Sequence, residues 1–113
     1  LQLTNDGRGL SQFTAKVWAR VDTSGTPSAR DSHNVSSIGD NATGDFTIYF
    51  TNNMANTNYC EQAHTSDVNH NSALLIAHIY GSPAVGSGRV LCTNSGADVG
   101  EDGHDVNYLV FGD

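Results

Sequence analysis

The segment from Arg30 to Phe50, RDSHNVSSIGDNATGDFTIYF, constrains the fold of this chain more than any other segment. Its last part alternates, with Phe46, Ile48 and Phe50 separated by Thr47 and Tyr49. Side chains two residues apart in a strand point to the same face, so the three apolar side chains predict one buried face of a sheet. The residues before them favour left-handed backbone and local hydrogen bonds, and so predict a turn. These turn residues are Asp40, Asn41, Thr43, Gly44 and Asp45. Together they predict a β-hairpin or β-arch.

Other short segments have the same character. Strands are predicted over Lys16–Asp22, Ala29–Ile38 (intact or broken), Asp45–Thr51, Asn58–Ala63, Ala73–Tyr80, Gly88–Asn94 and Asp105–Gly112. The run Ala73–Tyr80 is short enough for a strand buried on both faces, although its periodicity also allows one or two helical turns. No helical start signal is followed by a sustained apolar face of helical period. The sequence therefore predicts an all-β fold, an antiparallel β-sandwich of about seven short strands.

Composition excludes several classes of function. The chain has 113 residues, a length typical of one domain. Its net charge is −7 with only five Lys and Arg, so it lacks the basic surface that nucleic acids and anionic membranes require. It contains no run of about twenty apolar residues that would span a bilayer. Its hydrophobic content of 37% is low, which allows part of the core to be completed by other subunits.

Three segments carry a resemblance to a known family. The Arg30–Phe50 string, the preceding KVWARVD of Lys16–Asp22 and the closing DVNYLVFGD of Asp105–Asp113 resemble the C-terminal domain of tailed-bacteriophage and prophage tail fibres. The resemblance is dense from about Val17 to Tyr59 and weaker beyond. It implies a virion structural protein, located in the tail fibre and extracellular when functional, that forms an intertwined homotrimer and attaches to a bacterial surface receptor, either a glycan or an outer-membrane protein.

The resemblance also implies a division of the chain. Residues 1–14 are expected to be an extended lead-in from a longer fibre, and residues 15–113 to be the C-terminal β-sandwich fibre domain. The start at Leu1 and the finish directly after an apolar strand fit the C-terminal piece of a longer polypeptide.

Candidate receptor-binding residues come mainly from one polar segment. His64–Ser72, HTSDVNHNS, is predicted to be a loop, and loops commonly carry binding residues. The candidates in it are His64, Asp67, Asn69, His70 and Asn71. Trp18 is a further candidate, because an exposed Trp offers a platform for sugar stacking. The alternative for Trp18 is core packing near the sheet edge.

The last predicted strand contains the candidate trimer interface. Tyr108, Leu109, Val110 and Phe111 are consecutive large side chains, so they load both faces of that strand. Strands of this pattern are covered on both faces, and a single core covers only one. We therefore expect a second subunit to cover the other face, with Tyr108 or Leu109 pointing outward.

Signals for chemistry are weak. Cys60 and Cys92 fit two separate thiols better than a disulfide, and the metal status stays unknown. The acidic segment with Asp98, Glu101, Asp102 and Asp105 has a calcium-like composition without EF-hand spacing, and we expect a solvated hairpin loop, because turns use Asp and Gly. Five histidines occur without HxH or HxxxH spacing, although one His per chain on a trimer axis is possible. No nucleophile elbow is present. We expect neither catalysis nor a cofactor.

Two other functions stay open. The chain is alternatively a secreted carbohydrate-binding module, monomeric and calcium-dependent. It is otherwise a purely structural fibre domain that makes no receptor contact. The mass in solution separates the first of these from a trimeric fibre.

Overall fold

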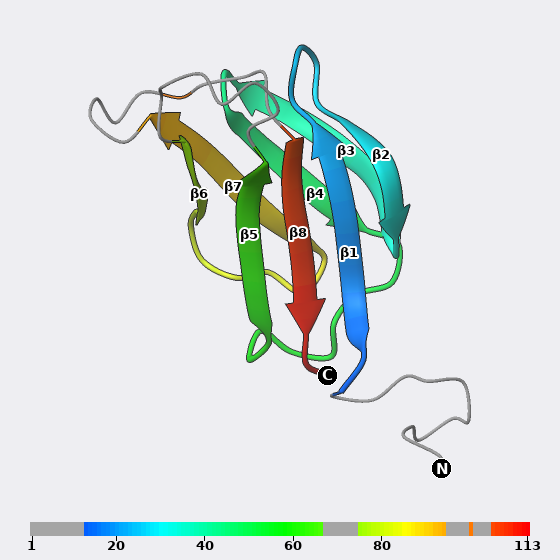
Figure 1. Cartoon of the computed structure of the whole chain (residues 1–113). Helices are drawn as coiled ribbons and strands as arrows, with labels where there is room; N and C mark the ends of the chain where they lie inside the picture. Colours follow the sequence, from blue (N-terminus) through cyan, green and yellow to red (C-terminus); the bar gives the residue numbers. More distant parts are fainter. Residues whose placement is uncertain (1–12, 67–74, 95–99, 101–104) are drawn as a thin grey trace.

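The fold is an all-β sandwich of two antiparallel sheets packed face to face (Figure 1). The structure is a computed structural model, and it describes residues 13–66, 75–94, 100 and 105–113. In these residues the strands are β1 (Ala15–Asp22), β2 (Ser28–His33), β3 (Val35–Ala42), β4 (Asp45–Phe50), β5 (Cys60–Ser66), β6 (Leu75–Ile79), β7 (Ser87–Asn94) and β8 (Asp105–Phe111). The predicted fold class is confirmed. None of the described segments forms a helix long and apolar enough to cross a membrane.

The strand order differs between the two sheets. Sheet A has the order β2-β1-β8-β5, and sheet B has the order β3-β4-β7-β6. The closing strand β8 therefore lies centrally in sheet A, between β1 and β5. The predicted hairpin is confirmed as the β3–β4 pair, in which Gly44 has a φ of 71°. Its turn is shorter than expected, because Asp40 and Asn41 belong to β3.

Asn34 divides the predicted segment Ala29–Ile38 into two strands on different sheets. It has a φ of 59°, which breaks the extended backbone between β2 and β3. Asn tolerates this left-handed conformation because its side chain forms local hydrogen bonds. Here the Asn34 Oδ1 accepts a hydrogen bond from the Asn52 backbone N at 2.8 Å, and the Asn34 Nδ2 donates to the Asn52 O at 3.0 Å. The bend carries the chain from sheet A to sheet B.

The core lies between the sheets and follows the predicted alternation. Phe46 and Ile48 are fully buried and Phe50 nearly so, as expected. They meet Val17, Ala19 and Val21 of β1, Val106, Tyr108 and Val110 of β8, Val90 and Cys92 of β7, and Met54. Each fully buried side chain of this size contributes roughly 1.5–3 kcal/mol relative to an exposed one. The residues of a single chain therefore bury this core.

Tyr108 spans the interior from sheet A to sheet B. Its hydroxyl donates to the Glu61 Oε2 at 2.5 Å, and a Cβ added at Gly88 would lie 2.0 Å from that hydroxyl oxygen. Gly88 therefore provides the space that the tyrosine ring and hydroxyl fill. Burial, followed by the hydrogen bond to Glu61, holds the pKa of Tyr108 far above its usual value.

Two strands differ from the sequence prediction. β5 extends to Ser66, so His64 lies in a strand and not in a loop. β6 is an edge strand of sheet B with one face in solvent, because Ile76 and His78 are exposed while Ala77 and Ile79 pack against the core. The expectation that this run is buried on both faces was wrong. A compact apolar run does not reveal whether its strand is central or at an edge.

Candidate functional site

The outer face of sheet A carries the main candidate site. Residues of β1 and β8 alternate strictly, so the residues between the buried ones point away from the core. Trp18 and Phe111 are exposed there to 39% and 37%, and Leu109 is half-buried beside Trp18. On β5, the exposed Cys60, Gln62 and His64 pair in register with Phe111, Leu109 and Asn107. We call the set Trp18, Cys60, Gln62, His64, Leu109 and Phe111 the sheet A patch.

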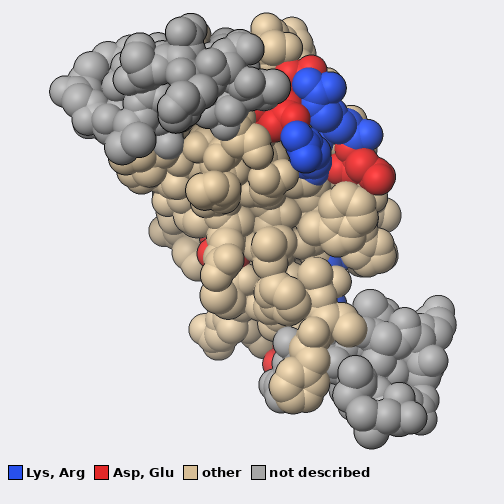
Figure 2. Space-filling model, in the orientation of Figure 1, with Lys and Arg blue, Asp and Glu red and all other residues tan. Residues whose placement is uncertain are grey.

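The sheet A patch contains no Asp, Glu, Lys or Arg. Figure 2 shows this side of the molecule: the blue and red side chains gather mainly at one corner, and most of the described surface elsewhere is uncharged. An aromatic and aliphatic surface without charge has a small cost of desolvation, so it is suited to contact with another macromolecule.

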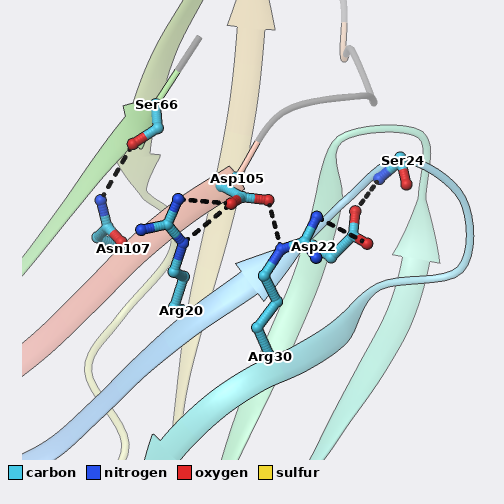
Figure 3. A network of polar contacts seen from close by, with 7 residues as sticks. All are labelled: Arg20, Asp22, Ser24, Arg30, Ser66, Asp105 and Asn107. Atoms are coloured by element: carbon cyan, nitrogen blue, oxygen red, sulfur yellow. Dashed lines mark hydrogen bonds and ion pairs between the residues drawn. The ribbon is translucent and has the colours of Figure 1, made fainter. Parts of the chain in front are cut away.

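An ionic network borders the patch where β1 ends and β8 begins (Figure 3). The Arg20 Nε and the Arg30 Nε both donate to Asp105, to Oδ2 and Oδ1 respectively, each at 2.9 Å. Arg30 also pairs with Asp22 at 3.1 Å. Burial raises the pKa of Asp105, but the hydrogen bonds and charges of Arg30 and Arg20 outweigh it, so the pKa lies below its usual value. The carboxylate thus stays ionised, and it fixes two half-exposed guanidinium groups side by side.

Asp22 and Ser66 complete the border of the patch. The Ser24 backbone N donates to the Asp22 Oδ1 at 2.9 Å, which holds the turn after β1. This hydrogen bond is the main reason why the pKa of Asp22 is lowered. Across β8, the Asn107 Nδ2 lies 3.5 Å from the Ser66 Oγ (Figure 3). The charged groups are therefore bound to each other at this corner, and they leave the centre of the face neutral.

The predicted receptor-binding residues fall into two groups. Trp18 is exposed, so packing in the core is wrong for it, and His64 points to the same outer face on β5. β8 lies between their strands, and Trp18 pairs with Leu109 while His64 pairs with Asn107, an arrangement that their sequence positions did not indicate. Asp67, Asn69, His70 and Asn71 lie outside the described residues, as do residues 1–12 of the expected lead-in.

The four candidate interface residues divide by alternation. Tyr108 and Val110 are buried in the core of their own subunit, with exposures of 1% and 0%. The expectation that Tyr108 is available on an outer face was therefore wrong. Leu109 and Phe111 remain on the outer face of sheet A. The physical reason is that the second sheet already covers one face of β8, so only alternate residues are left for a partner.

The structure also places the candidate metal and thiol residues. Cys60 is exposed and Cys92 is buried, and the two are not joined in a disulfide. Among the described residues, no group of three or more His, Cys, Asp and Glu is arranged to hold a metal ion. Asp105 of the acidic segment is bound to two arginines, so the solvated-turn interpretation is wrong for it. Asp98, Glu101, Asp102 and His104 lie outside the described residues, and so does His70.

A cleft of about 750 Å³ lies beside the patch, near the start of β1 and the end of β8. Its lining residues are Lys16, His33, Asn34, Thr51, Asn52, Asn53, Met54, Ala55 and Asp113. Much of its polar lining already has partners: Asn34 binds Asn52, and the Lys16 Nζ donates to the Gly112 O at 2.7 Å. The hydrogen bond between Asn34 and Asn52 in this lining connects the β2–β3 bend to the segment after β4.

Sequence reasoning missed the ionic network and the neutral patch. Arg20 and Asp105 are 85 positions apart, and no local spacing connects them. Alternation in KVWARVD did separate Trp18 and Arg20 from the buried face, which was the available signal. Comparisons with protein-family models, curated proteins and solved structures found no match for this chain.

Proposed function

We propose that this chain is the C-terminal domain of a phage tail fibre, which assembles as a homotrimer and attaches the virion to a bacterial surface receptor. The observation that supports the proposal best is the neutral sheet A patch. The resemblance of the Arg30–Phe50 segment to tail-fibre domains is a second line of support. The proposal involves no catalysis and no cofactor.

The patch suits contact between identical subunits. Three copies carry a total negative charge three times that of one chain, so most of their surfaces repel each other. The sheet A patch avoids this repulsion because it carries no formal charge. Burying apolar surface there stabilises an assembly by about 25 cal/mol per Å². Trp18, Leu109 and Phe111 provide the largest side chains for such contact.

This arrangement leaves sheet B and the loops facing outward. A trimer whose sheet A faces surround the axis presents three copies of sheet B to the surroundings. Three weak contacts to one cell surface give a much higher avidity than one contact. The receptor is a surface glycan or an outer-membrane protein.

Sedimentation of the purified domain tests the assembly. Three copies of 12.0 kDa predict a particle of about 36 kDa at micromolar concentration. The Leu109→Asp variant introduces charge at the patch, and we expect it to sediment as a monomer. Ser37→Asp is a matched control, since it adds the same charge at an exposed site on β3, in the other sheet. An unmutated chain that stays monomeric would contradict the proposal.

Attachment is tested by labelled domain and flow cytometry on a panel of bacterial species. Binding to cells of at least one species is expected, and Leu109→Asp should weaken it through loss of avidity. Deletion of residues 67–74 separates an attachment domain from a purely structural one. This deletion spares His64, which the structure places in β5.

A monomeric carbohydrate-binding module is the second candidate. The observation that favours it is the core of a single chain, in which seven hydrophobic residues of the described segments have an exposure of 0% without any partner. A mass of 12 kDa together with sugar binding would support it. Calcium dependence of the binding would support it further.

A further inference from the structure

The outer face of sheet B has a different composition from the sheet A patch. On it lie Asn41 of β3, Asp45, Thr47 and Tyr49 of β4, Arg89 of β7, and Tyr80 directly after β6. Thr47 pairs in register with Arg89, and Tyr49 lies two residues from Thr47 on the same strand face. Hydrogen-bonding side chains are thus flanked by tyrosine rings on neighbouring strands.

The polar groups of this face are held in fixed positions. Arg89 forms a two-point ion pair with Asp45, with the Nε 2.8 Å from Oδ1 and Nη2 2.5 Å from Oδ2. The Asn41 Nδ2 donates to the Asp45 Oδ1 at 3.2 Å and to the Thr47 Oγ1 at 2.9 Å. The Arg89 guanidinium also lies 4.7 Å from the centre of the Tyr80 ring. Groups that are fixed before binding lose little conformational entropy when a ligand arrives.

These groups retain capacity for a ligand. The Asn41 Oδ1 is an acceptor, the Thr47 hydroxyl is a donor, and Arg89 has further N–H donors beyond its two bonds to Asp45. No contact within the described part of the chain uses them. Arg89 is accessible, since its side chain is 43% exposed. Donors and acceptors thus lie together in the cluster that these hydrogen bonds connect.

Tyr49 provides an aromatic surface beside them. Its ring is 44% exposed and leans over Gly39, where a Cβ would lie 2.9 Å from the ring Cε2. The glycine therefore lets the ring lie down along the sheet next to Thr47. A tyrosine in this position offers a large contact area with few rotatable bonds.

We propose that the outer face of sheet B is a binding site for an uncharged pyranose glycan. A pyranose ring has a C–H face that packs on an aromatic ring and hydroxyls at its rim that both donate and accept hydrogen bonds. Tyr49 supplies the first surface, and Asn41, Thr47 and Arg89 supply the second. The charges of Asp45 and Arg89 neutralise each other, which favours a neutral sugar over an acidic one.

Sugar binding by this face depends on the fold of one chain alone. Its role as the receptor contact rests on the proposed function. In a trimer that buries the sheet A patch, sheet B faces outward and stays accessible. The two proposals therefore use opposite faces of the sandwich and can fail separately.

The test is a titration of the isotope-labelled domain, followed by NMR. The probes are maltohexaose, cellohexaose and chitohexaose, with oligogalacturonate as the acidic comparator. At about 10 mM, which populates sites with a Kd of about 1 mM, at least one neutral probe should shift amide signals of β3, β4 and β7. Tyr49→Ala should weaken that binding by about tenfold. Phe13→Ala, which removes an exposed aromatic that precedes β1 and belongs to neither face, should leave the affinity per site unchanged.

Three outcomes would overturn the site: no shift with any neutral probe, preferential binding of oligogalacturonate, or unchanged binding by Tyr49→Ala. Sedimentation of the same samples separates the two proposals. A trimer without sugar binding contradicts the glycan site only. A monomer that binds a neutral probe on sheet B contradicts the fibre assembly only.

Discussion

The two outer faces of the sandwich differ in where their charged side chains lie. On sheet A, Trp18, Leu109 and Phe111 form a neutral surface, and the charged groups are bound to each other at its border. On sheet B, Asp45 and Arg89 lie within the face and hold polar groups in place beside Tyr49. A surface without fixed polar groups suits burial against a large partner. A surface with fixed donors and acceptors suits a small polar ligand. The two proposals accordingly assign assembly to the outer face of sheet A and glycan binding to the outer face of sheet B.

The largest expected effect on the free energy of unfolding comes from the core that lies between the two sheets. Phe46→Ala removes a fully buried ring from the core and should cost roughly 3–5 kcal/mol in the free energy of unfolding. Tyr49→Ala, on the opposite face of the same strand, should cost under about 1 kcal/mol. Urea denaturation of both variants measures the two costs. Equal costs would show that β4 does not separate core from surface.

The link between the sheets should give the next largest effect. Gly88→Ala places a Cβ against the Tyr108 hydroxyl and should cost roughly 1–3 kcal/mol. Tyr108→Phe removes that hydroxyl and its bond to Glu61, at a similar cost. The double variant should be more stable than the sum of the two costs predicts, because the clash and the hydroxyl disappear together. Strict additivity in denaturation experiments would contradict this contact.

Tyr108 also predicts a loss of stability in alkali. Its folded-state pKa is raised, chiefly by burial, while the unfolded chain keeps the ordinary value of about 10. The stabilisation is therefore complete below pH 10 and is lost as the pH rises above it, since only the unfolded state releases the proton. Melting temperatures between pH 8 and about 11 should fall more steeply for the unmutated chain than for Tyr108→Phe. Parallel curves would mean that the hydroxyl is accessible.

Acid should weaken the ion pairs of Asp105 in sheet A and of Asp45 in sheet B. The pKa of Asp105 on sheet A and of Asp45 on sheet B is lowered, so their stabilisation is present above pH 4 and is lost as the pH falls through the folded-state values. For Asp45 the main cause is the hydrogen bond from Arg89. Asp105→Asn and Asp45→Asn should each reduce the acid dependence of the melting temperature. We expect the larger reduction for Asp105, which is the more buried and binds two arginines.

The smallest stability effects should come from the exposed aromatics that distinguish the two faces. Trp18→Ala and Tyr49→Ala should change the stability of an isolated subunit by about 0.5–1 kcal/mol. Their effects on association should differ: Trp18→Ala weakens self-association, and Tyr49→Ala leaves it intact. Sedimentation across a concentration series measures this difference. If both variants weaken self-association equally, the faces do not have separate roles.

Much of the fold could be predicted from local patterns. The alternation of Phe46, Ile48 and Phe50, and of Val17, Ala19 and Val21, is a property of neighbouring residues, so it was confirmed in detail. Boundaries were less accurate. β5 continues through His64 to Ser66 because pairing with β8 extends a polar segment that has no strand signal of its own.

The candidate sites could not be predicted to the same extent, because they join residues from distant segments. Trp18 was a candidate by itself, but its position next to Leu109 and across β8 from Gln62 depends on the order β2-β1-β8-β5. The ion pair of Asp45 with Arg89 and the close approach of Tyr49 to Gly39 likewise need the pairing of β4 with β7 and β3.

Local patterns in the sequence are sufficient to predict the class of the fold, the hairpin at Gly44 and the faces of β1 and β4, because side chains in a strand alternate whatever the strand pairs with. The sequence also determined the scarcity of basic residues, with five Lys and Arg in 113 residues. Only the tertiary structure decided that Asn34 turns one predicted strand into two on opposite sheets. The structure also decided that Tyr108 lies inside while Leu109 lies outside. The physical reason is that burial depends on which strands pair and which sheets stack, and those contacts are long-range.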